Sequence, residues 1–183
     1  MASRERRIEG RILSRRSQLG YGDALAIRRA RLARGGFGYV DIMLLPKRGP
    51  HRLVLIEAKH EQSADAAGKV VGQLLLYYVA ALTLGRHGVR LLRRFAGKRR
   101  RAERAAPKSL QMLSGQSFKD DERALRQGPK LKPSEISLMI GLAREPSGSL
   151  KDLLTRLKRR HRIEVRVVTA SGHRHLKIWP TAK

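Results

Sequence analysis

The sequence predicts an α/β protein built on a mixed sheet, and three segments carry that prediction. Two strand-like apolar runs, residues 39–45 and 52–59, are joined by a short turn, which indicates a β-hairpin. A helix that is apolar on nearly every side follows over residues 64–84. Strand, helix and strand patterns then succeed one another over residues 135–170, the order of a parallel βαβ unit.

Two elements precede the hairpin. Residues 3–17 have an apolar stripe at helical spacing, and Glu5 and Glu9 lie towards the N-terminal end, where negative charge stabilises a helix. Residues 24–33 can form a strand or a second helix, because the spacing of their apolar residues does not separate the two.

The second strand of the hairpin is apolar on both faces. Such a strand lies inside a sheet that is covered on both sides. Because alternate side chains of a strand share a face, the two faces can be written down. One carries Leu53, Leu55, Glu57 and Lys59, and the other carries Val54, Ile56 and Ala58.

The C-terminal half continues the same sheet after a long basic segment. Residues 135–143 read as a strand, and the next helix is capped by Ser147 or Ser149. A strand with alternating apolar residues follows at 162–170, and "LKIW" is a possible edge strand. The sequence contains no internal repeat.

We expect a single domain in three parts. Residues 1–84 hold the N-terminal part of the core and the candidate site, and residues 134–183 complete the same core. Between them, residues 85–133 form a basic insertion of helices and loops with a poor core of its own. This insertion contains 15 Lys or Arg residues against 4 Asp or Glu.

The charge of the chain restricts its partners. The 183 residues carry a formal net charge of +26, which opposes compaction unless a polyanion such as nucleic acid or an anionic membrane offsets it. The most apolar window, residues 70–84, is shorter than a membrane span, so a buried helix and no membrane partner are expected. The lack of cysteine excludes disulfides and thiol catalysis, and no signal peptide is recognisable, which fits a cytoplasmic protein.

An acid and a lysine at the end of the second hairpin strand suggest chemistry. Glu57 and Lys59 are two residues apart and therefore project together. A turn near "KRGP" can bring Asp41, on the preceding strand, beside Glu57. Two neighbouring carboxylates repel unless a cation joins them, and such hard oxygen ligands suit Mg²⁺ or Mn²⁺. Taken alone, Glu57 and Lys59 favour a surface ion pair, because such tripeptides are common in any charged protein.

Four further residues are expected to belong to the same candidate site. Gly38 precedes Asp41 as G-x-x-D and permits a close approach of the backbone or a substrate. Gln73 and Tyr77 are four residues apart on the apolar helix, so they share a face and need polar partners. Glu9, from the first helix, could bring another carboxylate.

The chain resembles the PD-(D/E)XK nuclease superfamily through these residues and motifs, in this order: Glu9, Gly38-x-x-Asp41, Glu57-x-Lys59 and Gln73-x-x-x-Tyr77. The Gln-x-x-x-Tyr element is typical of its RecB-like branch, and the spacing is similar to that of the nuclease domain of NucS-type mismatch endonucleases. The resemblance covers residues 5–84 and extends to 135–170.

The resemblance implies a restriction-endonuclease-like α-β-β-β-α-β core and Mg²⁺-dependent hydrolysis of DNA, with Mn²⁺ as a possible substitute. It implies that Asp41, Glu57 and the Ala58 carbonyl ligate the metal and that Lys59 positions the water. Glu9 would be an outer or second-metal acid. The polar pair on the helix would steady the site or touch the phosphate.

The chain departs from this pattern in two respects. Val40 precedes Asp41 in place of the proline of the superfamily name, and the basic insertion is not part of the common fold. Mismatch specificity is not carried over, because the N-terminal domain of the mismatch enzymes is not recognised here. An endonuclease is expected rather than an exonuclease, since no helicase or clamp domain accompanies the core.

Several residues keep alternative interpretations. Glu9, like Glu5, could simply stabilise the N-terminal end of its helix, and the glutamine–tyrosine pair could be a polar pair of the core. His60 and Glu61 are read as solvated residues at a strand end. His173 and His175 could bind a metal, but "SGHRH" is more typical of a hairpin turn.

The basic segment has three interpretations: a clamp on the DNA backbone, a site for a protein partner, or a solvated arm. The first is favoured, because phosphate contacts position a nucleic acid without reading its sequence. The residues expected to bind DNA are Lys98, Arg99, Arg100, Arg101, Arg159 and Arg160.

Two other classes of function compete with the nuclease. One is a catalytically inactive nucleic-acid-binding protein on the same fold, and the other is a basic RNA-binding structural protein. The few aromatic residues do not form a platform for base stacking. A homodimer is possible, because symmetric cutting of two strands would require one.

Overall fold

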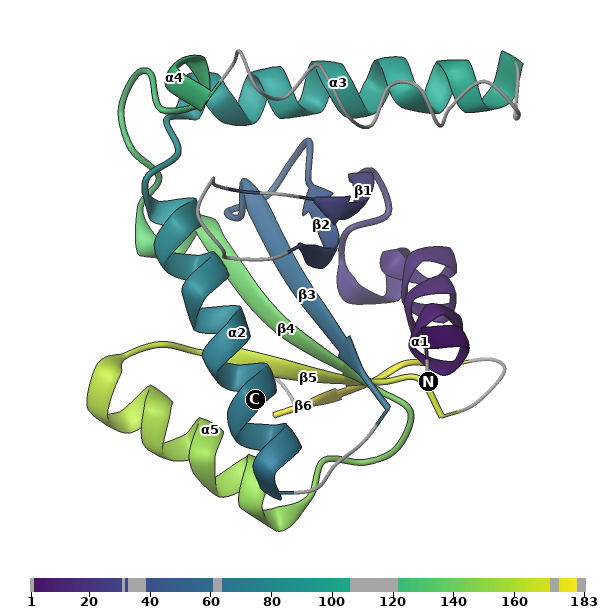
Figure 1. The fold of residues 1–183 in the computed structure, drawn as a ribbon, viewed down its shortest axis with the longest axis vertical. Coiled ribbons are helices and arrows are strands. Elements are labelled where there is room, and N and C mark those ends of the chain that lie inside the picture. The colour runs from purple at the N-terminus through teal and green to yellow at the C-terminus, as the bar shows by residue number, and fades with distance from the viewer. Residues whose placement is uncertain are drawn as a thin grey trace.

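Six strands form one mixed sheet whose spatial order is the order of the sequence. The computed structural model describes residues 2–30, 32, 39–60, 64–105, 122–171 and 175–180. The strands are β1 (Leu25–Ala30), β2 (Val40–Leu45), β3 (Leu53–Lys59), β4 (Ile136–Leu142), β5 (Val165–Thr169) and β6 (Lys177–Trp179). The helices are α1 (Ala2–Ser14), α2 (Ala64–Leu82), α3 (Arg86–Ala105), α4 (Glu122–Leu125) and α5 (Gly148–His161) (Figure 1).

The first three strands form an antiparallel meander, and the next two join it in parallel. The predicted hairpin of β2 and β3 and the predicted parallel unit of β4, α5 and β5 are both confirmed. The short strand β6 pairs antiparallel with β5 at one edge, as expected for "LKIW". Residues 24–33, for which the sequence left strand and helix open, contain strand β1 at the other edge.

The two faces of the sheet bury separate apolar clusters, as the alternation in β3 predicts. Leu53 and Leu55 belong to the cluster under α2, α3 and α5. Val54 and Ile56 belong to the cluster under α1. All four side chains are fully buried, so β3 is the central strand of a sheet that is covered on both sides.

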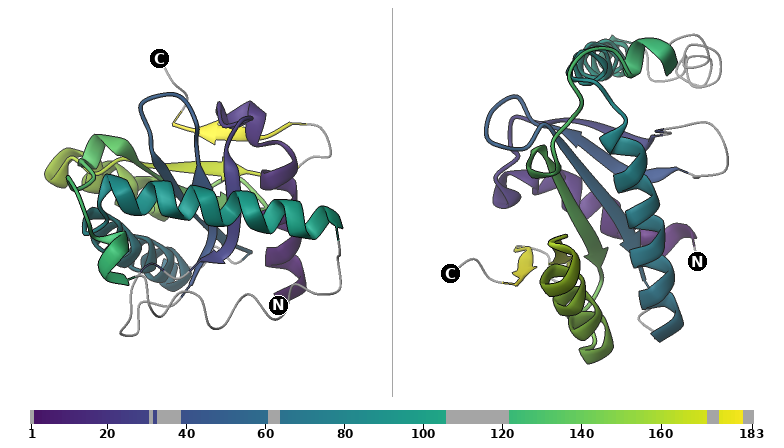
Figure 2. Two further views of the ribbon diagram at one scale, coloured as in Figure 1. Left: turned by 90° about the horizontal axis from the view of Figure 1, so that it is seen from above. Right: turned by 90° about the vertical axis from the view of Figure 1, so that its left-hand side faces the viewer.

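The basic helix α3 runs across one end of the molecule, over β1 and β2 (Figures 1 and 2). Its apolar residues Val89, Leu92 and Ala96 are buried in the same cluster as α2. The predicted basic helical segment is therefore helical over α3 and α4, and α3 packs on the main core instead of forming a core of its own.

Two local signals fix the ends of helices. Ser147 caps α5, because its hydroxyl accepts a hydrogen bond from the Leu150 N–H at 3.3 Å. The first helix ends at Ser14, earlier than the predicted residue 17, and a 3₁₀ turn, Arg16–Leu19, follows it. Gly20 closes that turn with a φ of 81°, a left-handed conformation that glycine adopts without strain. None of the helices in the described ranges combines the length and the apolar character needed to cross a lipid bilayer.

Candidate active site

Four elements converge where β3 ends. The chain enters β2 and leaves β1 at this same end of the sheet, and residues of α1 and α2 flank it. A cleft of about 520 Å³ lies between them. It is lined by Glu5, Arg6, Glu9, Arg28, Arg29, Tyr39, Asp41, Glu57, Lys59 and Gln73.

The hairpin register places the two predicted metal ligands next to each other. Ile42 pairs with Ile56, so Asp41 and Glu57 are the next residues along the two strands. The Ala58 N–H donates a hydrogen bond of 2.9 Å to Asp41 Oδ2 and holds this carboxylate against β3. Burial raises the pKa of Asp41, although the Ala58 N–H and Lys59 act against the rise.

Glu57 is the most deeply buried acid of the cleft, with a side chain that is almost completely shielded from solvent. Burial, and then the neighbouring charge of Asp41, raise the pKa of Glu57 to about 7. One of its oxygens, Oε2, is buried and has no hydrogen-bond partner among the described residues. Buried polar atoms are normally satisfied, so an orphaned carboxylate oxygen calls for an ion or a water that completes the site.

Lys59 contacts two of the acids. Its Nζ lies 3.3 Å from Glu57 Oε1 and 3.8 Å from Glu5 Oε1. Burial alone would lower the pKa of this ammonium, but the charges of Glu57 and Glu5 outweigh burial and hold the pKa above its ordinary value. Lys59 is therefore kept as a cation at the mouth of the cleft.

Both acids of the first helix reach the site. Glu9 is buried, and its pKa is raised by burial and then by the charge of Asp41. Glu5 makes the contact with Lys59. The sequence analysis left a helix-end role open for both residues; the structure places both in the cleft, where Glu5 is an addition to the predicted site.

The polar pair of α2 divides into two roles. Gln73 lines the cleft and donates a hydrogen bond of 2.6 Å from Nε2 to the Tyr77 hydroxyl. That hydroxyl donates in turn to the Tyr39 carbonyl at 2.9 Å, and burial, followed by the charge of Glu57, raises the pKa of Tyr77 to about 12. Tyr77 thus fastens α2 to the backbone just ahead of Asp41, while Gln73 faces the cleft.

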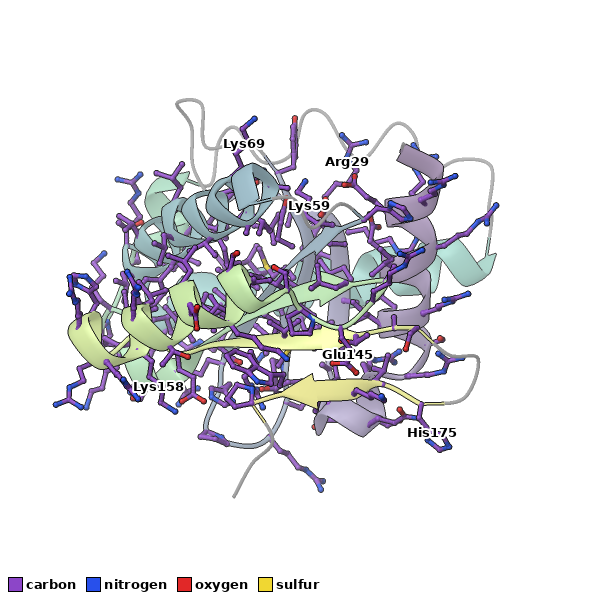
Figure 3. All side chains as sticks on the ribbon, turned by 90° about the horizontal axis from the view of Figure 1, so that it is seen from below. Arg29, Lys59, Lys69, Glu145, Lys158 and His175 are labelled. Atoms are coloured by element: carbon purple, nitrogen blue, oxygen red, sulfur yellow. The ribbon has the colours of Figure 1, made fainter. Side chains whose placement is uncertain are left out.

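Cations surround these acids in a way that the sequence analysis missed. Arg28 and Arg29 line the cleft from β1, and Arg6 lines it from α1. A second cavity of about 580 Å³ shares Lys59 with the cleft and adds Arg4 and Lys69. Figure 3 shows Arg29, Lys59 and Lys69 gathered on one side of the molecule. The available signal was the doubled arginine in "AIRRA", which is uninformative until the strand is known.

The other predicted residues have varied outcomes. Arg159 and Arg160 are exposed at the end of α5 and do not line the cleft. Their neighbour Lys158 lies well away from Lys59 in Figure 3. The other four expected DNA-binding residues belong to α3, and the structure does not describe their side chains. These residues are Lys98, Arg99, Arg100 and Arg101.

Among the described residues, no histidine lines the cleft. His60 lines the neighbouring cavity, and His175 is exposed before β6. Gly38, Glu61 and His173 lie outside the described residues. Within the described part of the chain, no group of three or more His, Cys, Asp or Glu side chains is arranged to hold a metal ion. The acidic pair of Asp41 and Glu57 is the arrangement that comes nearest to the predicted site.

The carbonyl of Ala58 stays a predicted ligand. Its residue is fully buried in β3, between β2 and β4, and its N–H is engaged by Asp41. The cleft thus joins two adjacent carboxylates, one orphaned oxygen, a lysine held as a cation and a rim of arginines.

Comparison of the chain with models of protein families, with curated proteins and with solved structures finds no match.

Proposed function

We propose that the protein is a metal-dependent DNA nuclease of the PD-(D/E)XK type, acting as an endonuclease. The observation that carries the proposal is the meeting of Asp41, Glu57 and Lys59 at one end of the sheet, with a buried Glu57 oxygen that lacks a hydrogen-bond partner. The order α1, β1, β2, β3, α2 and β4, with α3 and α4 inserted between α2 and β4, supports the proposal, because the resemblance implies an α-β-β-β-α-β core.

The acidic pair fits a divalent cation. Glu57 Oε2 is orphaned, and the hydrogen bond from Ala58 occupies one oxygen of Asp41 and leaves the other available. Burial raises the pKa of both carboxylates, and the negative charge of Asp41 raises the pKa of Glu57 further. A bound Mg²⁺ would offset that repulsion and stabilise the negative charge of a phosphoryl group in its transition state.

The chain's own groups would then position the reactants. Lys59, kept protonated by Glu57 and Glu5, would hold a water by hydrogen bonding and offset charge that develops on a phosphate oxygen. Gln73 can hydrogen-bond a phosphate or the water from α2. Tyr77 acts as a positioning residue, because it touches Gln73 and the backbone before β2.

The surroundings suit a polyanionic substrate. Five cationic side chains lie around the acidic pair in the two adjoining cavities: Arg4, Arg6, Arg28, Arg29 and Lys69. Such cations attract a phosphodiester backbone and bring it towards carboxylates that would otherwise repel it. This rim, together with the net charge of +26, also favours the second candidate, a nucleic-acid-binding protein without catalysis.

Replacement of single site residues separates the two candidates. Plasmid, single-stranded, branched and mismatched DNA are incubated with Mg²⁺, with Mn²⁺ and with chelator. We expect metal-dependent cleavage that falls by about 100-fold or more in Asp41→Asn and Lys59→Ala, because both changes remove electrostatic stabilisation at the reacting centre.

The matched control is Lys158→Ala, which removes a cation that pairs with Glu164 far from the cleft and should leave cleavage unchanged. Calorimetric titration of Mn²⁺ adds a readout that is independent of activity, and Asp41→Asn should weaken this binding. DNA binding without cleavage of any of the four substrates would reject the nuclease and favour the second candidate.

A further inference from the structure

Strand β1 breaks its own alternation beside the cleft. Ile27 and Ala30 are three residues apart, so in a regular strand they would face opposite sides of the sheet. Both are instead buried in the cluster under α2. The two residues between them, Arg28 and Arg29, are both exposed, and both line the cleft.

The cause is a left-handed backbone at Arg29, whose φ is 51°. The strand register is unchanged across it, because Arg28 pairs with Ile42 and Ala30 pairs with Val40. No residue is inserted, and Arg29 therefore occupies the position opposite Asp41. A non-glycine residue in this conformation is strained, and such strain tends to persist where it serves a site.

The two guanidinium groups are open to an external anion. Neither Arg28 nor Arg29 forms an ion pair within 4.0 Å with an acid in the described ranges, although Glu9 and Asp41 line the same cleft. Arg29 is placed with its guanidinium 5.9 Å from the centre of the Tyr39 ring, a cation–π distance that orients it at the rim. Figure 3 shows Arg29 on the same side as Lys59.

We propose that Arg28 and Arg29 form a clamp for a phosphate of the nucleic-acid backbone, next to the phosphate at Asp41 and Glu57. Guanidinium groups bind phosphate oxygens through two parallel hydrogen bonds, so two consecutive arginines on one side of a cleft fix both the position and the direction of a strand. The clamp rests on the proposed function, because the reacting phosphate defines its neighbour. Its specificity is for the backbone and not for base sequence.

The test uses Arg29→Gly and Arg28→Gln, singly and together. Glycine suits the left-handed backbone, so Arg29→Gly removes the guanidinium while it keeps or raises the melting temperature. The matched control is Lys47→Gln with Arg48→Gln. It removes two exposed charges from the turn between β2 and β3, at the end of this hairpin that is opposite the cleft.

Binding of a fluorescent DNA duplex of about 20 base pairs is measured by anisotropy in chelator, at several salt concentrations. We expect each single change to weaken binding by roughly 5- to 10-fold, and the double change to reduce the slope of log affinity against log salt by roughly 2, more than the control does. In cleavage assays the same changes should raise KM more than they lower kcat. Equal effects in the double variant and the control would overturn the clamp.

These assays identify the source of the bound phosphate, and they separate a failure of the clamp from a failure of the nuclease. Inorganic phosphate at about 1 mM, at constant ionic strength, should not displace the duplex from a backbone clamp; displacement would assign the arginines to a free phosphate and reject the proposal. If Asp41→Asn abolishes cleavage while the arginine variants bind normally, the clamp fails and the nuclease stands. If wild-type protein cleaves nothing but the arginine variants lose binding, the nuclease fails, and Arg28 and Arg29 remain a clamp for the backbone without a reacting phosphate beside them.

Discussion

At the scale of the residue, the burial of Glu57 opposes the charge that its proposed role requires. Its carboxyl is shielded from water, lies beside Asp41, and has one oxygen without a hydrogen-bond partner. The ion pair with Lys59 does not remove this cost, because the pKa of Glu57 is still raised to about 7. A buried charge that costs stability in this way is typical of groups retained for chemistry and not for stability.

Removal of this charge should stabilise the metal-free protein in a pH-dependent way. The ordinary pKa of 4.5 describes the unfolded chain, and the folded value is about 7, so the folded state binds the proton more tightly. Stability is therefore fully present below pH 4.5 and is lost as the pH rises through 7. We expect Glu57→Gln to raise the free energy of unfolding at pH 8 by roughly 1 to 3 kcal/mol relative to its effect at pH 4, while it abolishes cleavage.

Thermal unfolding in chelator at the two pH values measures this difference. The control is Glu164→Gln, because this exposed acid pairs with Lys158 at the surface and its loss should have little effect at either pH. A Glu57→Gln protein that is less stable than wild type at pH 8 would show that the ion pair with Lys59 outweighs the burial of the acid.

At the scale of the element, the packing of α3 determines whether the basic segment is part of the core. A Cβ added at Gly88 would lie 2.0 Å from the Leu125 carbonyl oxygen, so α4 approaches α3 as closely as a glycine allows. Gly85 is packed in the same way, with its added Cβ 1.7 Å from the Gln127 carbonyl oxygen. The start of α3 is thus fitted against the chain that returns to β4.

Two alanine substitutions in α3 test this packing. Gly88→Ala should lower the free energy of unfolding by about 2 kcal/mol or more, because the backbone of residue 125 must move. Gly97→Ala is the matched control, since nothing lies within 4 Å of its added Cβ. It should stabilise the helix by about 0.5 to 1 kcal/mol. Chemical denaturation of the two variants measures both effects, and equal stabilities would refute the close packing of α3 with α4.

At the scale of the whole molecule, the charge of +26 is distributed beyond the cleft. The last turn of α5 carries Lys158, Arg159, Arg160 and His161, and these residues are exposed. None of them is among the residues that line the cleft, and Lys158 is drawn well away from Lys59 (Figure 3), so a nucleic acid that reaches both places would have to extend across the molecule. The contribution of Arg159 and Arg160 to binding should therefore be electrostatic and should not affect the reacting centre.

A double substitution at the end of α5 distinguishes binding from catalysis. Arg159→Ala with Arg160→Ala should weaken binding of a long duplex and reduce its salt slope by roughly 2, with kcat unchanged. A duplex too short to span the molecule should show no such loss. If binding of the long duplex also stays as in wild type, the prediction that these two arginines bind DNA is wrong.

Most of the fold could be predicted because its signals are local. The continuous apolar run within residues 52–59 predicts a strand with two buried faces, and the short turn before it predicts the hairpin. Residues 24–33 could not be assigned, since strand and helix fit their apolar spacing equally well. Pairing with β2 decides for the strand, because hydrogen bonds to a neighbour outweigh weak local preference.

The candidate site divides along the same line. The period of the strand and the length of the turn predict that Asp41, Glu57 and Lys59 meet, so the sequence by itself determined the acidic pair and its lysine. Tertiary structure alone decided that Glu5 reaches Lys59 and that Arg28 and Arg29 both face the cleft. The first depends on the packing of α1 against the sheet and the second on a left-handed residue within a strand, and neither of these leaves a periodic signal in the sequence.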